Sequence, residues 1–311
     1  MAVFINEKAR DALNRLAAMP GMNQVKDQIE QMIQYRRIAE LRKQNRLKTG
    51  PQSNHMVFTG NPGTGKTTAA RLIGEAYAEI GLLKRQGDKV PFVEINHGKI
   101  SDSLVGEAEK RLASKFKEAK GGVLFIDEAY AFVGKAEHRQ DVKIIAEMVQ
   151  QIEDMREEVV VIAAGYPKNM AEFLSFNPGL ASRFPTTIHF PDYNVPDLVR
   201  IAQQMLLEQE YQAAPDYLDA LARVMWIEKS QPNFGNARTV RNHIERSIRR
   251  QSIRVSQMPQ PSRKDLATLI GADLVHSPGD VVHAERNALN QIIRDAQGRL
   301  FELDLQAISK L

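Results

Sequence analysis

The stretch at residues 60–68, GNPGTGKTT, constrains the fold of this chain more than any other. It lies between a short apolar run, MVFTG, and a segment with helical periodicity, which is the context that the pattern G-x-x-x-x-G-K-[ST] requires. Glycines let the backbone amides of such a loop turn inward around phosphate oxygens, and the following helix adds the positive end of its dipole. The alternative is a glycine turn that only caps a helix. The stretch therefore predicts a nucleotide-phosphate loop between a strand and a helix.

Two side chains of this loop carry specific roles. The Lys66 ammonium is expected to reach the β- and γ-phosphates, and the Thr67 hydroxyl is expected to bind Mg²⁺. The rest of the loop surrounds the phosphates. The predicted nucleotide-binding residues of the loop are Asn61, Pro62, Gly63, Thr64, Gly65, Lys66, Thr67 and Thr68.

Strand and helix patterns alternate from residue 55 to about residue 190. The apolar runs are MVFTG, PFVEIN, GGVLFID, EVVVIAAG and TTIHFPD. Continuous Val- and Ile-rich runs are typical of strands buried on both faces, and helices between them indicate parallel crossovers. The predicted fold class is α/β, with a parallel sheet sandwiched by helices.

A second unit is expected after residue 192, because only helical patterns follow there. Three apolar stripes predict a small all-α unit packed beside the α/β unit. We therefore expect four parts, which are a short N-terminal helix at 1–20, an α/β nucleotide-binding domain at 21–192, an all-α lid at 193–275 and a helical extension at 276–311.

The run GGVLFIDEAY ends in two carboxylates, Asp127 and Glu128. They follow a predicted strand at its carboxyl end, where α/β sheets bind ligands. Asp127 is expected to hold Mg²⁺ through water, and Glu128 to orient and deprotonate an attacking water. A small-molecule kinase would not need the second carboxylate, because its nucleophile comes from the substrate. The alternative is a strand that ends in a solvated acidic turn.

Two arginines are further candidates. Arg183 precedes the last predicted strand, and Arg238 stands at the start of a lid helix in FGNARTVRNHIE. Arginine spreads the charge of a transferring phosphoryl group, and a neighbouring subunit often supplies it. We expect Arg183 to act on a neighbour's nucleotide and Arg238 on that of its own subunit, with Arg241 sharing or replacing the second role. The alternative for each is a solvated charge at a helix end.

The composition of the chain bears on its partners and its cellular compartment. The chain has 311 residues, and its 42 basic and 38 acidic residues give a formal charge of +4, a mild excess that predicts no nucleic-acid partner by itself. It has no cysteine, which excludes disulfides and thiolate metal sites and fits a reducing compartment. No run approaches the roughly 18 apolar residues that span a bilayer, and the N-terminus lacks the apolar core of a signal peptide. We expect a cytoplasmic protein without a membrane contact.

Taken as a set, the motifs resemble a known family. GNPGTGKTT, GGVLFIDEAY, AGYP, NPGLASRF, FPDY and NARTVRN, in this order and spacing, resemble the stage V sporulation protein K and CbxX/CfxQ group of AAA+ ATPases, which includes the red-type Rubisco activase. The resemblance covers about residues 18–275. It implies an ATP-driven homo-oligomeric ring, usually a hexamer, that uses ATP and Mg²⁺ to remodel a protein client or thread it through a central pore. It also implies that Gly21 and Met22 lie near the adenine, and it assigns no phosphate contact to Tyr166.

The segment ISDSLVGEAEKR departs from that family's pattern. The resemblance places an aromatic-hydrophobic-glycine triplet of a pore-facing loop on Leu104, Val105 and Gly106, so the aromatic residue is missing. A leucine offers less contact area than an aromatic ring and no π face. Lys99 and Ala108 replace the family's typical acidic residue and threonine. We infer an unusual client or a weaker grip; the alternative is that Leu104 is a core residue that never contacts a client.

Three functions stay open at this stage. One is a protein-remodelling ATPase. Another is an ATP-gated assembly scaffold, in which the assembled state of the ring matters rather than translocation of a client. The remaining one is a nucleic-acid motor or loader that uses residues 238–264, a segment with eight basic residues and one acidic residue. That segment lacks interleaved aromatic residues, so a solvated helix face or a subunit contact is the alternative.

Overall fold

The computed structural model describes residues 7–50, 53–83, 89–101, 107–133, 139–231 and 234–274. The chain divides into two compact units, one ending at Asp192 and the other beginning at Tyr193. The predicted triplet Leu104, Val105 and Gly106 and the extension at 276–311 lie outside the described residues. None of the helices in the described ranges combines the length and apolar character that crossing a membrane needs.

The first unit is built on a five-stranded parallel sheet with the strand order β2-β3-β4-β1-β5. Each strand lies within one of the apolar runs that predicted it, so the α/β class with a parallel sheet is confirmed. The strand order reverses beside β1, which has β4 on one side and β5 on the other. Open α/β sheets bind ligands at the carboxyl ends of strands at such a switch point. The strands are β1 Met56–Thr59, β2 Phe92–Ile95, β3 Val123–Ile126, β4 Val160–Gly165 and β5 Thr186–His189.

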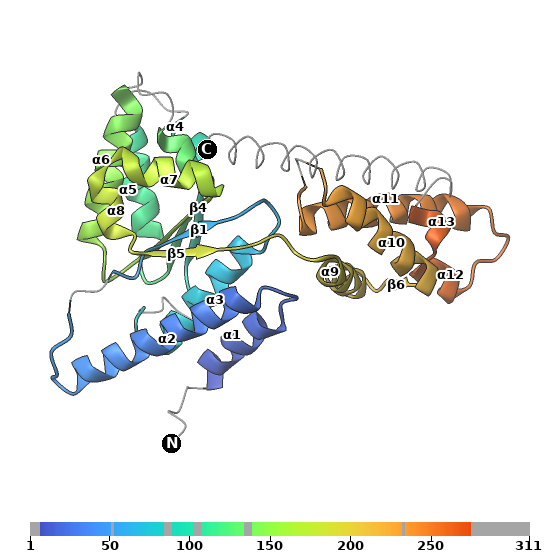
Figure 1. The fold of residues 1–311 in the computed structure, drawn as a ribbon, viewed down its shortest axis with the longest axis horizontal. Helices are drawn as coiled ribbons and strands as arrows, with labels where there is room; N and C mark the ends of the chain where they lie inside the picture. Colours follow the sequence, from blue (N-terminus) through green and yellow to red (C-terminus); the bar gives the residue numbers. More distant parts are fainter. Residues whose placement is uncertain are drawn as a thin grey trace, which may run out of the picture. The chain divides into compact units, whose positions relative to one another are not determined.

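Helices cover both faces of this sheet. Figure 1 shows α1 to α3 on one side of the strands and α4 to α8 on the other. The short 3-10 helix η1 (Ala129–Val133) directly follows β3. The helices are α1 Glu7–Ala18, α2 Asn23–Gln44, α3 Lys66–Glu79, α4 His97–Ser101, α5 Glu107–Glu118, α6 Arg139–Asp154, α7 Pro167–Phe176 and α8 Pro178–Arg183.

Successive residues of β3 pack into the core on opposite faces of the sheet. Leu124 and Ile126 of β3 belong to one fully buried cluster with Phe116 of α5. Val123 points to the opposite face, where a Cβ added at Gly74 of α3 would lie 2.6 Å from its methyl group. Successive strand residues point to opposite faces, so a strand covered on both sides needs apolar residues at every position. This is the physical reason for the continuous apolar runs.

The second unit is mainly helical. The predicted apolar stripes lie in its core, with Leu198, Leu221 and Val240 each 0% exposed. The expectation of helices alone is wrong at one point, because two short strands, β6 (Gln212–Ala213) and β7 (Thr268–Leu269), pair in parallel. Two residues are too few to show a strand period in a sequence. The helices are α9 Val195–Glu208, α10 Pro215–Glu228, α11 Ala237–Ser256, α12 Arg263–Ala267 and α13 Gly271–Leu274.

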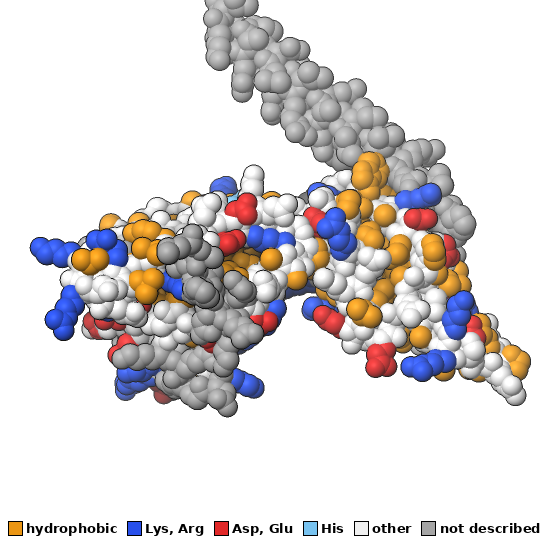
Figure 2. Space-filling view, turned by 90° about the horizontal axis from the view of Figure 1, so that it is seen from below, with side chains coloured by type: hydrophobic (Ala, Val, Ile, Leu, Met, Phe, Trp, Pro, Cys, Tyr) orange, Lys and Arg blue, Asp and Glu red, His pale blue; other side chains and the backbone are white. Residues whose placement is uncertain are grey.

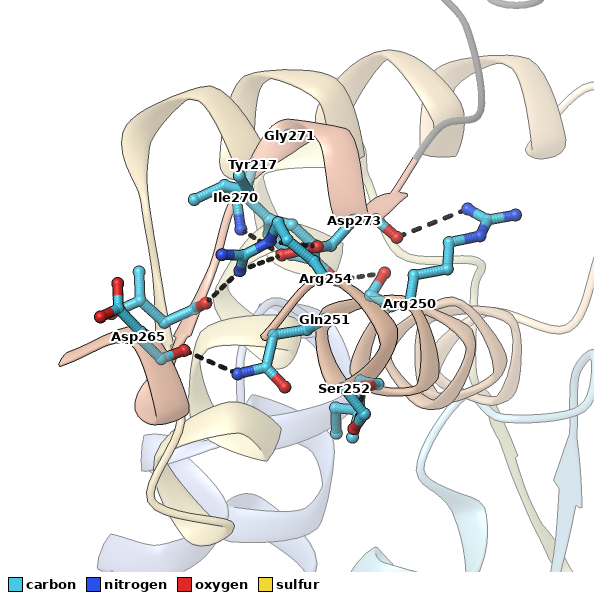
Figure 3. Close-up of polar contacts among 12 residues, drawn as sticks. Tyr217, Arg250, Gln251, Ser252, Arg254, Asp265, Ile270, Gly271 and Asp273 are labelled. Carbon is cyan, nitrogen blue, oxygen red and sulfur yellow. Dashed lines mark hydrogen bonds and ion pairs between the residues drawn. The ribbon is translucent and has the colours of Figure 1, made fainter. Parts of the chain in front are cut away.

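A polar network around Asp273 connects α13 to α11. Asp273 is 2% exposed, and its carboxylate accepts hydrogen bonds from Arg254 Nε and Nη2, both at 2.9 Å (Figure 3). The Ile270 N–H donates to the same carboxylate at 2.9 Å. Arg250 Nη1 donates to the Asp273 carbonyl at 3.4 Å. Both arginines thus bind inside the unit, and Arg254 compensates the buried charge of Asp273.

His55 predicts a loss of stability in acid. It is 2% exposed beside β1, and its Nδ1 accepts a hydrogen bond from the Val161 N–H at 3.0 Å. Burial lowers the pKa of His55 to about 4; the Ile152 backbone opposes this shift, and the positive charges of Arg36 and Arg183 add to it. Histidine in an unfolded chain titrates near pH 6.5, so the unfolded chain takes up this proton first.

The free energy of unfolding is therefore expected to fall as the pH drops from about 6.5 to about 4, by at most about 3 kcal/mol from this residue. Urea unfolding at about pH 7 and pH 4.5 measures the change. In His55→Asn the side-chain oxygen replaces Nδ1 as the acceptor, so the matched variant should lose less stability than the parent over the same interval. Equal losses in the two proteins would contradict this assignment.

Candidate functional site

The loop at 60–68 starts where β1 meets both of its neighbours. The Gly60 N–H donates to the Gly165 carbonyl of β4 at 3.1 Å, and the Phe190 N–H donates to the Thr59 carbonyl at 2.7 Å. Gly60 has φ 147°, and a Cβ there would lie 2.2 Å from the Phe190 carbonyl oxygen. Only glycine fits this position, because any side chain would collide with backbone.

The loop closes on itself. Thr64 is 0% exposed, and its hydroxyl donates to the Asn61 carbonyl at 2.8 Å. Gly63 and Gly65 have φ of 70° and 88°, in the left-handed region that favours glycine. Lys66 is the first residue of α3, and its ammonium also donates to the Asn61 carbonyl, at 2.8 Å. The first amides of α3 have no partner within the helix, so they form an anion-binding helix start next to a lysine.

Asn61 is fixed by a residue that the sequence analysis did not single out. Its Nδ2 donates to both carboxylate oxygens of Asp192, at 3.0 Å and 2.9 Å. Asp192 belongs to FPDY, the segment after β5. The contact connects the start of the phosphate loop to the last residue of the first unit. The two residues are 131 positions apart, so no local sequence signal could show it.

Asp127 and Glu128 lie at the same edge of the sheet as the loop. The Asp127 N–H extends the ladder by donating to the Ile95 carbonyl of β2 at 2.8 Å, and its carboxylate accepts a hydrogen bond from the Glu128 N–H at 3.1 Å. One strand, β4, separates β3 from β1. The ends of β3 and β1 are therefore roughly 10 Å apart, which is two strand spacings.

Glu128 stands out by its backbone. It has φ 49°, a left-handed conformation that costs an L residue roughly 1–2 kcal/mol. The backbone turns at Glu128, so β3 does not continue past Asp127 and η1 begins. The Ala131 N–H of η1 donates to the Glu128 carbonyl at 2.8 Å. The side chain of Glu128 is exposed, whereas Asp127 is half-buried. The kink thus gives two consecutive carboxylates different surroundings, as different roles in one reaction require.

A tyrosine pair borders this edge. The Tyr166 ring lies 6.1 Å from the Tyr130 ring, measured between centroids. A Cβ at Gly165 would lie 2.7 Å from the Tyr130 ring, so this glycine makes room for it. Burial raises the pKa of Tyr130, and the charge of Glu128 acts in the same direction. Tyr130 is a further neighbour of the site that sequence reasoning missed, although it lies within GGVLFIDEAY.

Arg183 lies at the opposite edge of the sheet. It ends α8, and β5 begins at Thr186 and runs parallel to β1. Its Nη1 donates to the Gly179 carbonyl at 3.1 Å, and its Nη2 lies 3.4 Å from the Glu153 carboxylate. A four-residue strand spans roughly 13 Å. The first unit therefore does not bring Arg183 to the phosphate loop of its own chain.

The other predicted residues lie as follows. Gly21 and Met22 have φ of 62° and 57° just before α2, and Met22 is 9% exposed. Arg238 and Arg241 are exposed on α11 of the second unit. Before that helix, Asn236 is 0% exposed, and its Oδ1 accepts a hydrogen bond from the Tyr193 N–H at 2.9 Å.

Comparison with known proteins agrees with this geometry. Residues 56–192 match the model of the "ATPase family associated with various cellular activities (AAA)", and residues 194–284 match the AAA lid domain. Stage V sporulation protein K of Bacillus subtilis is 38% identical over 262 residues, which are 83% of this chain and 80% of that protein. A chloroplastic ribulose bisphosphate carboxylase/oxygenase activase of Cyanidioschyzon merolae is 34% identical over 83% of this chain and 87% of its own length.

Protein CfxQ of Xanthobacter flavus is also 34% identical, over 82% of this chain and 80% of that protein. These alignments include the phosphate loop, the two carboxylates and the lid, so they extend well beyond a shared nucleotide motif. The resemblance that the motifs indicated is confirmed. The chain belongs to the AAA family of ATPases, with an AAA lid, and is related to stage V sporulation protein K, protein CfxQ and red-type Rubisco activase.

Proposed function

We propose that this chain is one subunit of an ATP-hydrolysing ring that remodels a protein client or threads it through a central pore. AAA ATPases hydrolyse ATP, and membership of the family assigns that reaction to this chain. Proteins of the family typically oligomerise, and a homohexamer is the assembly we propose. A sequence without cysteine fits the cytoplasm as the place of action.

We assign the reaction to side chains at the carboxyl edge of the sheet. Lys66 and the amides of the loop hold the ATP phosphates, and Glu128 accepts a proton from the attacking water. The water oxygen bonds to the γ-phosphorus, the bond to the bridging oxygen breaks, and ADP and phosphate leave. Thr67 and Asp127 offer the oxygen ligands that Mg²⁺ prefers, and the ion would neutralise charge on the phosphates.

The observation that carries the ring is the position of Arg183. An arginine that stabilises the charge of the transferring phosphoryl group adds to what Lys66 and Mg²⁺ supply, and Arg183 lies a full strand length from its own loop. In our proposal, Arg183 contacts the loop of a second copy of the chain instead. Head-to-tail contacts of this kind form a ring when the rotation between subunits closes.

The lid and the start of α2 have supporting roles in this proposal. Arg238, with Arg241 one turn on, contacts the nucleotide of its own subunit and reports its phosphate state to the lid. Gly21 and Met22 contact the adenine. A protein client is the substrate class we propose because one relative is an activase of ribulose bisphosphate carboxylase/oxygenase.

The nucleic-acid alternative loses support in the structure. Two of its eight basic residues, Arg250 and Arg254, bind inside the second unit. On the face drawn in Figure 2, basic and acidic side chains are interspersed, so that face is no basic surface. A phosphate-binding surface needs several free cations side by side.

Two measurements test the proposal. A tagged Glu128→Gln variant loaded with ATP should trap its client, which is then purified and added to the parent protein, where it should stimulate turnover. Leu104→Gly should abolish that stimulation in a threading motor and preserve it in a scaffold. Stimulation by DNA or RNA alone, or turnover per subunit that stays constant on dilution to monomers, would contradict the proposal.

A further inference from the structure

The backbone of Arg183 is anchored through Ser53. The Ser53 hydroxyl donates to the Arg183 carbonyl at 2.5 Å. The Ser53 carbonyl in turn accepts a hydrogen bond from the guanidinium of Arg36 on α2. Arg36 is 8% exposed, so this connection is part of the packed structure. The backbone of the arginine is thus held by α2 whatever its side chain does.

The guanidinium has two kinds of contact. Its Nη1 donates to the Gly179 carbonyl at 3.1 Å and to the Ser182 hydroxyl at 3.3 Å within α8, and Glu153 supplies its ion pair. Its Nη2 lies 3.4 Å from Oε2 of Glu153, near the end of α6. The other carboxylate oxygen, Oε1, accepts a hydrogen bond from Arg156 Nη1 at 2.8 Å. The Glu153 side chain is 46% exposed, whereas that of Arg183 is 25% exposed. One carboxylate is therefore shared by two arginines, and the contact to Arg156 is the shorter.

A large cavity opens at this edge of the sheet. Its volume is about 1090 Å³, and its lining includes Arg183, Glu153 and Arg156 together with Lys43 and Lys120. Small-molecule sites usually enclose about 300–1,000 Å³, so the space is sufficient for the phosphate end of a nucleotide carried by another molecule. The shared carboxylate is thus part of the wall of the space that Arg183 lines.

We propose that Glu153 is a positioning residue that holds the Arg183 guanidinium until a phosphate of a neighbouring subunit's nucleotide replaces it, and that Arg156 weakens this hold by competing for the same carboxylate. The inference rests on the proposed function, in which Arg183 completes the neighbour's pocket. A guanidinium binds phosphate oxygens in the same planar geometry as carboxylate oxygens, and the phosphate has the higher charge. The exchange replaces one anion by another without leaving the arginine unpaired.

The test is the dependence of ATPase activity on subunit concentration. Exposed ion pairs of this type change an equilibrium by up to about fivefold. Glu153→Gln should therefore lower the concentration of half-maximal activity per subunit by up to about fivefold, with the change in this concentration rather than in turnover at saturation. Arg156→Gln should raise that concentration. Glu157→Gln removes the same charge from the same cavity without touching Arg183, and it should shift nothing.

A double-mutant cycle separates the hold on Arg183 from a general effect of charge. ATP-dependent assembly, followed by sedimentation, should respond to Glu153→Gln in the parent protein and not in an Arg183→Ala background. An equal response in both backgrounds, or an equal shift with Glu157→Gln, would overturn the inference. Full turnover of the Arg183→Ala variant would instead overturn the proposed function. If Arg183→Ala is inactive but Glu153→Gln leaves the concentration of half-maximal activity unchanged, only the role of Glu153 is overturned.

Discussion

Replacement of Glu128 by glutamine is expected to lower the turnover number for ATP hydrolysis by a factor of about 10²–10⁴, the usual contribution of a general base. Glutamine keeps the size of the side chain and its hydrogen-bonding reach but does not accept the proton of the attacking water. ATP binding should survive, because the loop at 60–68 is unchanged. Single-turnover hydrolysis and binding of a fluorescent ATP analogue measure the two effects separately.

Glu172→Gln is a suitable control, since Glu172 is an exposed glutamate of α7 in the same unit. It should keep full turnover. The left-handed backbone of residue 128 remains in Glu128→Gln, so its stability should match that of the parent. If Glu128→Gln hydrolysed ATP at the parent rate, the base would have to be another residue, and the separate surroundings of Asp127 and Glu128 would lose their functional meaning.

Replacement of Arg183 by alanine is expected to lower turnover by a factor of about 10³ or more, the usual contribution of an arginine finger. The loss should appear in hydrolysis and not in nucleotide binding by an isolated subunit, because Arg183 and the loop lie at opposite edges of the sheet. Nucleotide binding at low protein concentration and turnover at high concentration measure the two properties.

Mixing two inactive variants tests whether the arginine acts between subunits. An Arg183→Ala subunit retains its own Lys66 and Glu128, and a Glu128→Gln subunit retains its Arg183. An interface is complete when the ATP pocket of an Arg183→Ala subunit faces the arginine of a Glu128→Gln subunit. In an equal random mixture about a quarter of the interfaces of a head-to-tail ring have this arrangement, so about a quarter of the parent activity should be recovered. An arginine that acts within its own chain would leave the mixture as inactive as its two components.

Much of the fold could be predicted because the signals for it are local. The five strands are continuous apolar runs, and a strand covered on both faces requires that pattern. The lid stripes with Leu198 and Leu221 follow helical periodicity in the same way. The β6–β7 pair was missed because its two-residue strands carry no period, and the paired residues Gln212 and Thr268 lie far apart in the chain.

The candidate site likewise contains residues that short motifs indicate and contacts that depend on the tertiary structure. Lys66, Thr67 and Asp127 could be proposed from the sequence because a phosphate loop and a carboxylate after a strand are short motifs with fixed chemistry. The bond from Asn61 to Asp192 joins residues far apart in the chain, and it carried no signal. The left-handed backbone of Glu128 was also invisible, since glutamate does not favour that conformation and only the surrounding packing imposes it.

The sequence by itself determined the class of this protein, the loop that holds phosphates and the residues with the right chemistry to hydrolyse ATP, because these depend on side-chain type and on spacing along the chain. Only the tertiary structure decided that Arg183 lies across the sheet from its own loop and that Glu153 is shared between two arginines. The physical reason is that strand order and packing decide at which edge of the sheet a residue lies and which distant charge it contacts. No short stretch of residues specifies strand order or packing.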